Sequence, residues 1–507
     1  MDLIHIHEAD NVALCRARLP AGSLVNWRGS MLELVTDVPA MHKVAVRPIA
    51  RGDAVLKYGQ VIGFASADIA VGAHVHEHNI QASDSRPDYA FCSQVPETDY
   101  VPESARASFQ GYRRANGKVG TRNFLAVAST VNCSVTVSRA IAAHFTTNGI
   151  LRNFPNIDGI VALGHDSGCG MSTHDEGYHN LRRTLSGYIG HPNFAGVLLI
   201  GLGCEAMQVA SVLKESGLET GPHFQTLTIQ GSGGTRAAVA AGVEALTAML
   251  PAANACERET VPASELTLAV QCGGSDAYSG ITANAALGAA ADLLVRHGGT
   301  VIYSETPEIY GAEHLLTRRA VSPEVAQKLV DRIHWWEHYT EINGVALNNN
   351  PSPGNKAGGL TTIAEKSLGA QAKGGTSALQ DVYLYAEPVR KKGLVFMDSP
   401  GFDPVSVTGQ IASGASVVCF TTGRGSAFGA KPVPSIKLAS NSQLFQRMRE
   451  DMDIDCGGIL DGEHTVASCG EMVFQRILAI ASGERSASEQ LDYGDNEFAP
   501  WRIGAVI

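Results

Sequence analysis

Short apolar runs that end in glycine-rich turns recur along this chain. The clearest is Leu266 to Gly280, LTLAVQCGGSDAYSG, in which an apolar run stops at Cys272 and two glycines follow. A helix rich in small residues is expected directly after it, from Ile281 to His297. Because the first N–H groups of a helix lack partners within that helix, a strand that leads through glycines into a helix predicts an anion-binding turn.

Three further apolar runs end at or close to a cysteine. They lie in Thr121 to Cys133, Gly159 to Cys169 and Val197 to Glu205. From 109 to 260 such runs alternate with helical patterns, which predicts a parallel sheet covered by helices on both faces. Ligands of such sheets bind beyond the carboxyl ends of the strands, where we expect Cys133, His165, Cys169, Cys204 and Glu205.

The first 80 residues show short apolar runs at close spacing, separated by turn residues, which predicts a small β domain. Residues 81 to 108 have no sustained period and contain Pro, Ser and Asp, as linkers do. We therefore divide the chain into a β domain (1–80), a linker (81–108), a central α/β domain (109–260) and a C-terminal α/β domain (261–507).

The β domain ends in a histidine-rich segment, His74 to Asn79, with the sequence HVHEHN. Alternate residues of a strand share one face, so a strand here would point His74, His76 and His78 the same way. Three imidazoles on one face can bind a first-row divalent metal. The alternative is a polar surface strand that happens to be rich in histidine.

Composition narrows the function classes. The 507 residues include 54 glycines and only 6% aromatic residues, which favours an α/β enzyme with many strand-to-helix turns. The net charge of −11 argues against a nucleic-acid or anionic-membrane partner. The chain shows no run of 18 apolar residues and no secretory signal. Ten cysteines without a CxxC motif fit a reducing compartment, so we expect a cytoplasmic protein.

The strand-end cysteines allow two kinds of chemistry. Cys133, Cys169, Cys204 and Cys272 come from separate strands and could together hold an iron–sulfur cluster or a metal. Cys169 with His165 could instead act as the nucleophile pair of a hydrolase, although no protease motif surrounds them. The alternative for each single cysteine is ordinary burial.

Two glycine-rich loops carry isolated basic residues. Lys356 lies in Asn350 to Gly359, and Arg424 lies in Gly423 to Gly429. Backbone donors with a lysine, or the forked guanidinium of an arginine, suit a carboxylate or a polyol. An ordinary tight turn is the alternative for each loop.

Six segments together resemble the altronate/galactarate dehydratase family, and they span nearly the whole chain. They are HVHEHN (74–79), GYRRANG with VGTRN (111–123), GLGCE (201–205), QCGGSDAYSGITAN (271–284), NPSPGNKAGG (350–359) and TTGRG (421–425). The resemblance implies the α/β class, with a small N-terminal SAF (β-clip) domain followed by two α/β domains with mainly parallel sheets.

The resemblance also implies a hydro-lyase that converts a sugar acid to a 2-keto-3-deoxy sugar acid and water. It implies a divalent metal, usually iron. We therefore expect Fe2+ or another divalent metal such as Mn2+, with an iron–sulfur cluster on the strand-end cysteines as the alternative. HVHEHN is more similar to altronate dehydratases, whereas the QCGGSDAYSG and 452–455 regions are as similar to galactarate dehydratases. We therefore expect D-altronate as the substrate, with galactarate or another 2-hydroxy acid as the alternative.

The expected partner is thus a small sugar acid, and we expect a homodimer or higher homo-oligomer without nucleic-acid or membrane partners. A sugar-acid-binding protein without turnover is the non-catalytic alternative. Dehydration requires a base for the C2 proton, an acid for the C3 hydroxyl and a Lewis acid. We assign acid–base roles to His165, Glu205 and Asp276. We assign substrate binding to Gly273, Gly274, Ser275, Lys356 and Arg424, and metal binding to His74, His76 and His78 or to the four cysteines.

Overall fold

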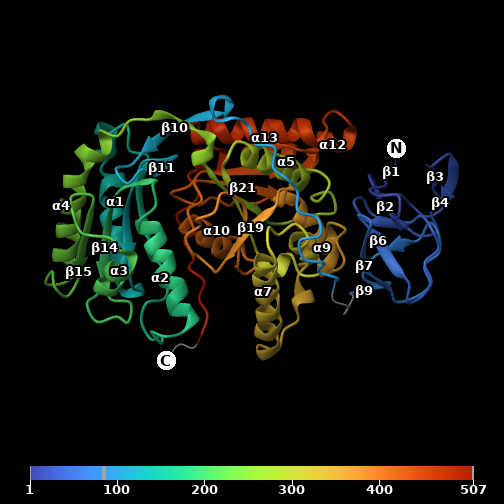
Figure 1. The fold of residues 1–507 in the computed structure, drawn as a ribbon, viewed down its shortest axis with the longest axis horizontal. Coiled ribbons are helices and arrows are strands. Elements are labelled where there is room, and N and C mark those ends of the chain that lie inside the picture. Colours follow the sequence, from blue (N-terminus) through green and yellow to red (C-terminus); the bar gives the residue numbers. More distant parts are fainter. Residues whose placement is uncertain (1, 83–86, 505–507) are drawn as a thin grey trace.

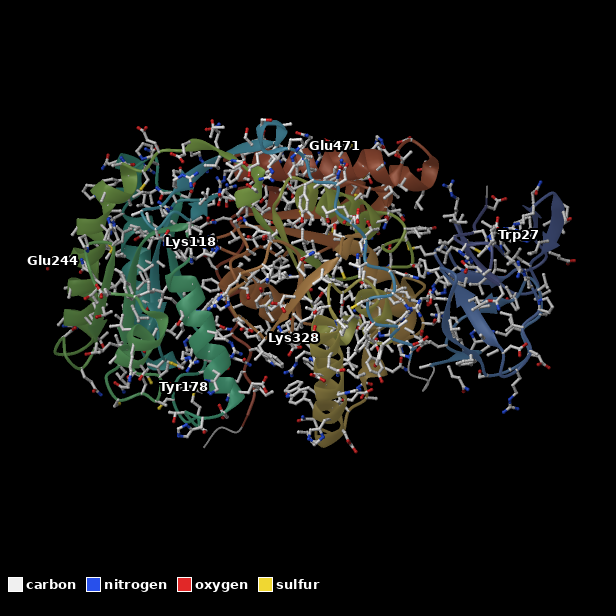
Figure 2. The ribbon with its side chains drawn as sticks, in the orientation of Figure 1. Trp27, Lys118, Tyr178, Glu244, Lys328 and Glu471 are labelled. Atoms are coloured by element: carbon white, nitrogen blue, oxygen red, sulfur yellow. The ribbon has the colours of Figure 1, made fainter. Side chains whose placement is uncertain are left out.

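The computed structural model describes residues 2–82 and 87–504. Its three parts lie in a row, with the C-terminal part between the N-terminal and the central parts (Figure 1). Trp27 and Glu244 mark the two ends of this row in Figure 2. The predicted α/β class with a small N-terminal β domain is confirmed.

The N-terminal part contains only short strands, paired antiparallel in three small sheets. The sheet orders are β1-β2-β5-β8, β6-β7-β9 and β3-β4. Tight turns at close spacing keep these strands short, and Gly72 shows why glycine is needed in one of them. Gly72 has φ +81°, and an added Cβ would lie 2.0 Å from the Glu33 carbonyl oxygen. The strands are β1 (Leu3–Ile4), β2 (Val12–Cys15), β3 (Leu24–Trp27), β4 (Ser30–Glu33), β5 (Lys43–Ala45), β6 (Ala54–Lys57), β7 (Gln60–Ala65), β8 (His74–Val75) and β9 (Ile80–Gln81).

The central part is built on a parallel sheet of four strands in the order β13-β12-β14-β15. Its strands are β12 (Phe124–Ser129), β13 (Gly159–Leu163), β14 (Phe194–Gly201) and β15 (Phe224–Thr228), and its helices are α1 (Val135–Thr147), α2 (Glu176–Ile189), α3 (Val209–Ser216) and α4 (Thr235–Asn254). A small antiparallel sheet, β11-β10-β16, borders it and is formed by β10 (Ser108–Arg113), β11 (Val119–Gly120) and β16 (Glu259–Pro262).

The C-terminal part contains a parallel sheet of seven strands in the order β19-β20-β18-β17-β21-β22-β23. The strands are β17 (Thr267–Cys272), β18 (Thr300–Ser304), β19 (Leu379–Tyr383), β20 (Gly393–Met397), β21 (Val417–Thr422), β22 (Ser435–Ala439) and β23 (Ile454–Asp455). The helices are α5 (Ala283–Arg296), α6 (His314–Thr317), α7 (Pro323–Ile342), α8 (Pro353–Ala357), α9 (Ile363–Gln371), α10 (Asp403–Ala412), α11 (Ser442–Arg447), α12 (Gly458–Asp461), α13 (Val466–Ala481) and α14 (Ala487–Gln490).

The central and C-terminal parts share a hydrophobic core. Leu185 and Tyr188 of α2 belong to the same buried cluster as Val407 and Ile411 of α10. The helices approach so closely that an added Cβ at Gly187 would lie 2.2 Å from the Ala412 carbonyl oxygen. Because a close-packed core of this kind resists deformation, the two parts hold the loops at their strand ends in fixed positions relative to one another.

Helix α4 is, within the described ranges, the one helix long and apolar enough to cross a membrane by length and composition. Its buried side chains, among them Leu246 and Leu250, pack with Leu125 and Leu198 of the central sheet. This packing explains why α4 is apolar, because the helix covers one face of the central sheet.

Candidate active site

The centre of the C-terminal sheet has a topological switch point. From β17 the chain continues to β18 on one side, whereas β21 pairs with β17 on the other. The chain therefore continues from β17 and from β21 toward opposite edges of the sheet. Open parallel sheets bind their ligands in the crevice formed at such a point.

Both loops at this crevice are glycine-rich, as the sequence predicted. The Gly274 carbonyl accepts hydrogen bonds from the N–H groups of Gly423 (3.1 Å) and Arg424 (3.0 Å). Gly274 has φ +62°, and a Cβ added to Gly273 would lie 2.5 Å from Asp403 Oδ2. Glycine at 273 thus lets the backbone pass directly beside a carboxylate. Gly273, Gly274 and Arg424 lie together at this turn.

A cavity of about 500 Å³ opens beside this turn. It is lined by Cys272, Gly273, Gly274, Glu308, Lys366 and Asp403, with Asn355 of α8 on a further wall. The Asn355 amide donates to the Ser275 carbonyl (2.8 Å), which fixes α8 against the β17 loop. The volume suits a small polar ligand.

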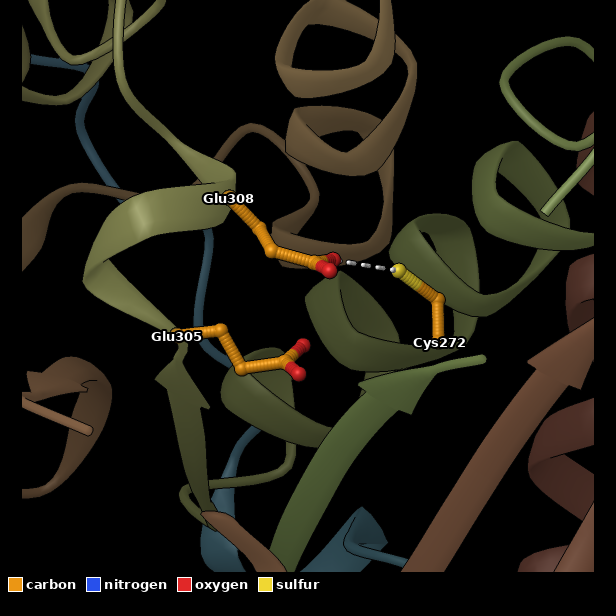
Figure 3. Close-up of side chains that lie close together, drawn as sticks. All are labelled: Cys272, Glu305 and Glu308. Carbon is orange, nitrogen blue, oxygen red and sulfur yellow. Dashed lines mark hydrogen bonds between the residues drawn. The ribbon is translucent and has the colours of Figure 1, made fainter. Parts of the chain in front are cut away.

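A buried network of charged side chains lies beside this cavity, and Figure 3 shows three residues that belong to it, Cys272, Glu305 and Glu308. The Lys373 ammonium donates to Cys272 Sγ and to Glu305 Oε2, each at 2.9 Å. The Lys366 ammonium donates to Glu308 Oε1 (2.6 Å) and to Asn350 Oδ1 (2.7 Å). The Cys272 thiol lies 3.6 Å from Glu308 Oε2. Two carboxyl groups and two ammonium groups thus lie together, and all four side chains are buried.

Gln271 links this network to Asp403, the first residue of helix α10. Its amide nitrogen donates to Glu305 Oε1 (2.6 Å) and to Asp403 Oδ1 (3.0 Å). Burial raises the pKa of Asp403 to about 6, with the Glu308 charge adding to the shift. Asp403 is therefore ionised at neutral pH and is a stronger base than an ordinary aspartate.

The two buried glutamates differ in their pKa. Burial, then the neighbouring Glu308, raises the pKa of Glu305. Burial would raise that of Glu308 as well, but Lys366 and Lys373 outweigh it and lower the pKa. Burial raises the pKa of the Cys272 thiol to about 12. Glu308 is the carboxylate that stays ionised.

Glu305 has a left-handed backbone, with φ +75°, directly after β18. A side chain in this region of φ/ψ space costs about 1–3 kcal/mol and persists where the surroundings determine it. Here the N–H of Glu305 donates to Ser399 Oγ (3.1 Å) while its carboxylate meets Lys373. Such strain is found preferentially at functional sites.

Cys272, Glu305 and Glu308 are the one set of three His, Cys, Asp or Glu donor atoms within 4.8 Å of one another in the part of the chain that the structure describes. The set does not suit a divalent metal. Both carboxylates and the thiol already accept from Lys366 and Lys373, whose ammonium groups would repel a dication at short range. This cluster is equipped to move and hold protons instead.

Four histidines of the N-terminal part gather on the other side of α8. His42 Nδ1 lies 3.0 Å from His74 Nε2, and the ring centroid of His76 lies 4.6 Å from that of His42. The His78 ring lies 5.3 Å from the His74 ring. The prediction of a strand through these residues was wrong, because β8 ends at Val75 and a turn follows. The turn nevertheless brings the rings together and adds His42, which the sequence analysis missed.

The histidine cluster fits a divalent metal better than the carboxylate cluster does. Burial, followed by the neighbouring His42 and His76, lowers the pKa of His74 to about 3. Burial and then Lys43 lower the pKa of His76 to about 4. These imidazoles are therefore neutral at pH 7, which is the form that binds metal. His76 Nδ1 is buried and has no hydrogen-bond partner among the described residues.

Helix α8 connects the histidine cluster to the cavity. Ser352 caps it in a reciprocal capping box with Asn355, so a five-residue helix forms where the sequence predicted only a loop. Lys356 of α8 pairs with Glu77 (2.5 Å), and the Ala357 carbonyl lies 3.3 Å from His42 Nε2. Asn355, on the same helix, lines the cavity.

The three predicted acid–base residues do not meet at one site. His165 and Glu205 follow strands of the central sheet, whereas Asp276 follows β17 of the other sheet. Both His165 ring nitrogens are occupied, by the Ser129 carbonyl (3.0 Å) and the Ser167 N–H (3.2 Å). Burial lowers the pKa of His165 to about 4.

Asp276 and Glu205 likewise have their carboxylates filled by local donors. Asp276 accepts from Ser279, Ser440 and Asn441 at 2.8 to 3.0 Å. Glu205 accepts from the Thr130 hydroxyl (2.7 Å) and the Gly203 N–H (2.6 Å). Burial alone would raise the pKa of Glu205, but hydrogen bonds from the backbone and from Thr130 outweigh it and lower the pKa. Each carboxylate holds a loop in place.

The predicted cluster of four cysteines needs correction. Cys133, Cys169 and Cys204 are exposed and follow β12, β13 and β14 of the central sheet. Cys272 is buried in the other sheet beside Lys373, so it belongs to a different site.

Three family models match consecutive parts of the chain. The model described as "Altronate/galactarate dehydratase SAF domain" matches residues 1–83. "D-galactarate dehydratase/Altronate hydrolase, second domain" matches 111–254, and "D-galactarate/Altronate dehydratase, C-terminal" matches 263–506.

Three curated relatives match over nearly their full length. An altronate dehydratase of Bacillus subtilis (strain 168) is 36% identical over 510 residues, covering 99% of each chain. An altronate dehydratase of Escherichia coli (strain K12) is 36% identical and covers 100% of both chains. A galactarate dehydratase (L-threo-forming) of the same organism is 37% identical, covering 95% of this chain and 93% of its own.

Proposed function

This chain belongs to the altronate/galactarate dehydratase family, and from that premise we propose that it dehydrates a sugar acid to a 2-keto-3-deoxy sugar acid. D-altronate is the proposed substrate, because two full-length relatives bear the name altronate dehydratase. Galactarate is the alternative, since a galactarate dehydratase is equally similar.

One observation carries the proposal at the level of chemistry. The cavity at the switch point places a carboxylate of raised pKa, Asp403, and an ammonium group, Lys366, on the walls of the same small space. Dehydration of a 2,3-dihydroxy acid requires a base and an acid at neighbouring carbons. A site with both groups in place supplies these two requirements.

Asp403 is the proposed base. It takes the C2 proton, and the electron pair of the C–H bond forms a double bond between C2 and C3 while hydroxide leaves C3. The resulting enol then returns a proton to C3 and becomes the 2-keto acid, so that one water is released in total. With its pKa of about 6, Asp403 is ionised yet basic at neutral pH.

Lys366 is the proposed acid for the leaving hydroxyl. Two of its three protons go to Glu308 and Asn350, and the ammonium borders the cavity. Burial would lower the pKa of Lys366, but the Glu308 carboxylate outweighs it and raises the pKa, so the group stays charged. Glu308 thus positions Lys366 and keeps it protonated.

The substrate carboxylate is assigned to the glycine turn. Gly273 and Gly274 line the cavity and Ser275 follows them, Arg424 lies on the adjoining loop, and Lys356 lies on α8. A planar guanidinium suits a carboxylate, whereas the Lys356 ammonium is paired with Glu77.

We assign a divalent metal, Fe2+ or Mn2+, to His74, His76 and His78, with His42 beside them. When bound, it would supply a Lewis acid at the histidine cluster. The neutral imidazoles and the unpaired Nδ1 of His76 support this assignment.

The test is product formation from D-altronate and from galactarate by the purified protein with Fe2+ or Mn2+. The 2-keto-3-deoxy product is measured directly. Replacement Asp403→Asn is expected to lower kcat by about 10²–10⁴-fold, the range of a lost general base. Asp331→Asn, on the exposed face of α7, is the matched control. Absence of product from both acids would reject the proposal for these substrates.

A further inference from the structure

Three cysteines lie at the carboxyl edge of the central sheet, away from the cavity described above. Cys133 follows β12, Cys169 follows β13 and Cys204 follows β14, and these strands are neighbours in the order β13-β12-β14. Among the ten cysteines, all within the described ranges, these are the three that are exposed. Exposed free thiols are unusual, since free cysteine is among the most buried residue types.

The loops that carry the thiols are bonded to one another. The N–H of Asn132, next to Cys133, donates to the Ser167 carbonyl (2.9 Å). The Gly168 carbonyl, next to Cys169, accepts from the N–H of Met207 (3.0 Å), three residues after Cys204. These bonds connect the first loop to the second and the second to the third.

Gly168 makes this approach possible. It has φ +99°, and an added Cβ would lie 2.2 Å from the Thr130 carbonyl oxygen on the neighbouring loop. A side chain at 168 would thus force the Cys133 and Cys169 loops apart.

The buried side chains of His165 and Glu205 connect the same three loops through hydrogen bonds. His165 bridges the Ser129 carbonyl and the Ser167 N–H, so it ties the Cys133 loop to the Cys169 loop. Glu205 bridges the Thr130 hydroxyl and the N–H groups of Leu202 and Gly203, which ties the Cys133 loop to the Cys204 loop. Two buried polar side chains therefore position three exposed thiols.

From this arrangement we infer that Cys133, Cys169 and Cys204 ligate an iron–sulfur cluster that keeps one iron without a cysteine ligand. Thiolates are soft ligands that select zinc, copper(I) or iron–sulfur clusters. A single tetrahedral zinc with 2.3 Å bonds needs sulfurs about 3.8 Å apart. The three sulfurs here are not all within 4.8 Å of one another. A cluster, in which each cysteine binds a different iron, does not require the sulfurs to approach one another this closely.

The surroundings fit such a cluster. The Gln230 amide donates to Cys204 Sγ (3.4 Å), and hydrogen bonds to sulfur are a usual feature of cluster sites. A cavity of about 650 Å³, lined by Asn132, His165, Arg139 and Arg502, adjoins the Cys133 loop. Arg502 is paired with Asp166 (2.8 Å), which lines the same space, so Arg139 is the arginine that offers its charge to a ligand. The class of ligand for the open iron is a small carboxylate or hydroxy acid.

The inference does not rest on the proposed function, because cluster content is measured without substrate. The full chain is purified without oxygen, and iron and acid-labile sulfide are quantified per chain, together with the visible absorption and electron paramagnetic resonance spectra. We expect both iron and sulfide in the wild-type protein. We expect sulfide to be lost in Cys133→Ser, Cys169→Ser and Cys204→Ser, whereas Cys92→Ser and Cys256→Ser retain it.

A second readout needs no variant. Alkylation followed by mass spectrometry is expected to leave these three thiols unmodified in the anaerobic protein and to label them after iron is removed by a chelator. Three outcomes would each overturn the inference. The wild-type protein could contain iron without sulfide, or the three variants could retain sulfide. The three thiols could also alkylate freely in the anaerobic protein. Loss of sulfide in Cys272→Ser as well would overturn the three-ligand assignment.

Discussion

The Lys43 ammonium of the N-terminal domain reaches the Glu365 carboxylate of α9 in the C-terminal domain at 2.8 Å, with both side chains fully buried. Lys57 binds the other oxygen of the same carboxylate at 2.8 Å. Lys43 also donates to the carbonyl of Gly359 (2.7 Å), two residues after the end of α8. These bonds attach the domain that carries the histidine cluster to the domain that carries the cavity.

Replacement Glu365→Gln is expected to loosen this attachment. It leaves two ammonium groups buried without a counter-charge, and breaking a buried ion pair costs about 3–5 kcal/mol. Denaturant unfolding and limited proteolysis of the linker would report the loss. The control is Asp37→Asn, which removes the charge of an exposed pair with Arg18 and should leave the free energy of unfolding nearly unchanged. Equal effects of the two changes would show that Glu365 does not hold the domains together.

The pH dependence of activity should reveal Asp403. Its pKa is raised to about 6, so the carboxylate gains a proton and ceases to act as a base as the pH falls through 6. We expect log(kcat/KM) to be level above this value and to fall by about one unit per pH unit below it. The residual activity of Asp403→Asn should not show this fall, which is the acid limb of the pH profile. An unchanged limb in that variant would assign it to another group.

Metal binding should depend on His76. His76→Ala removes one of the few side chains proposed to bind the metal directly. Loss of a residue that only orients a metal ligand weakens binding by up to about 100-fold, so the loss of His76 should weaken Mn2+ binding by more than that. Isothermal titration calorimetry on the metal-free protein measures this directly. His144→Ala, on the exposed side of α1, serves as the control. Undiminished binding in His76→Ala would move the metal elsewhere.

Gly273→Ala should distort the cavity, because the atoms around residue 273 leave little space into which an added methyl group could move. The added Cβ would lie 2.5 Å from both Asp403 Oδ2 and Phe420 Cζ, and overpacking of this kind costs about 1–3 kcal/mol. We expect a lower melting temperature together with a lower kcat. Gly221→Ala, whose Cβ would meet no atom within 4 Å, should change neither. A fully active Gly273→Ala protein would show that the backbone need not pass so close to Asp403.

The parts of the site that sequence reasoning located are those encoded by local pattern. An apolar run that ends in glycines marks the carboxyl edge of a strand, so Cys272, Gly273 and Gly274 were placed correctly at the end of β17. HVHEHN was found by its composition alone, although its secondary structure was predicted incorrectly. The SAF, central and C-terminal architecture was available through the resemblance.

The residues that were missed come from separate elements with no distinctive local pattern. Glu305 and Glu308 follow β18, Lys366 and Lys373 lie on or after α9, and Asp403 begins α10. The one available signal was that Glu305 directly follows a buried strand, at the edge that the sequence analysis had already chosen. The ordering of strands β17, β18 and β21 brings these residues together, and that order is not written in any single segment.

The attachment of the N-terminal domain also sets an order during synthesis. Lys43 and Glu365 are separated by 322 positions, so both lysines of this domain leave the ribosome long before their shared carboxylate exists. At about 5–20 residues per second the interval is roughly 15–60 s. During that time the histidine-bearing domain has no partner on which to dock. The last domain to be translated therefore completes the first, and a nascent chain arrested before α9 would carry its histidines on an undocked domain.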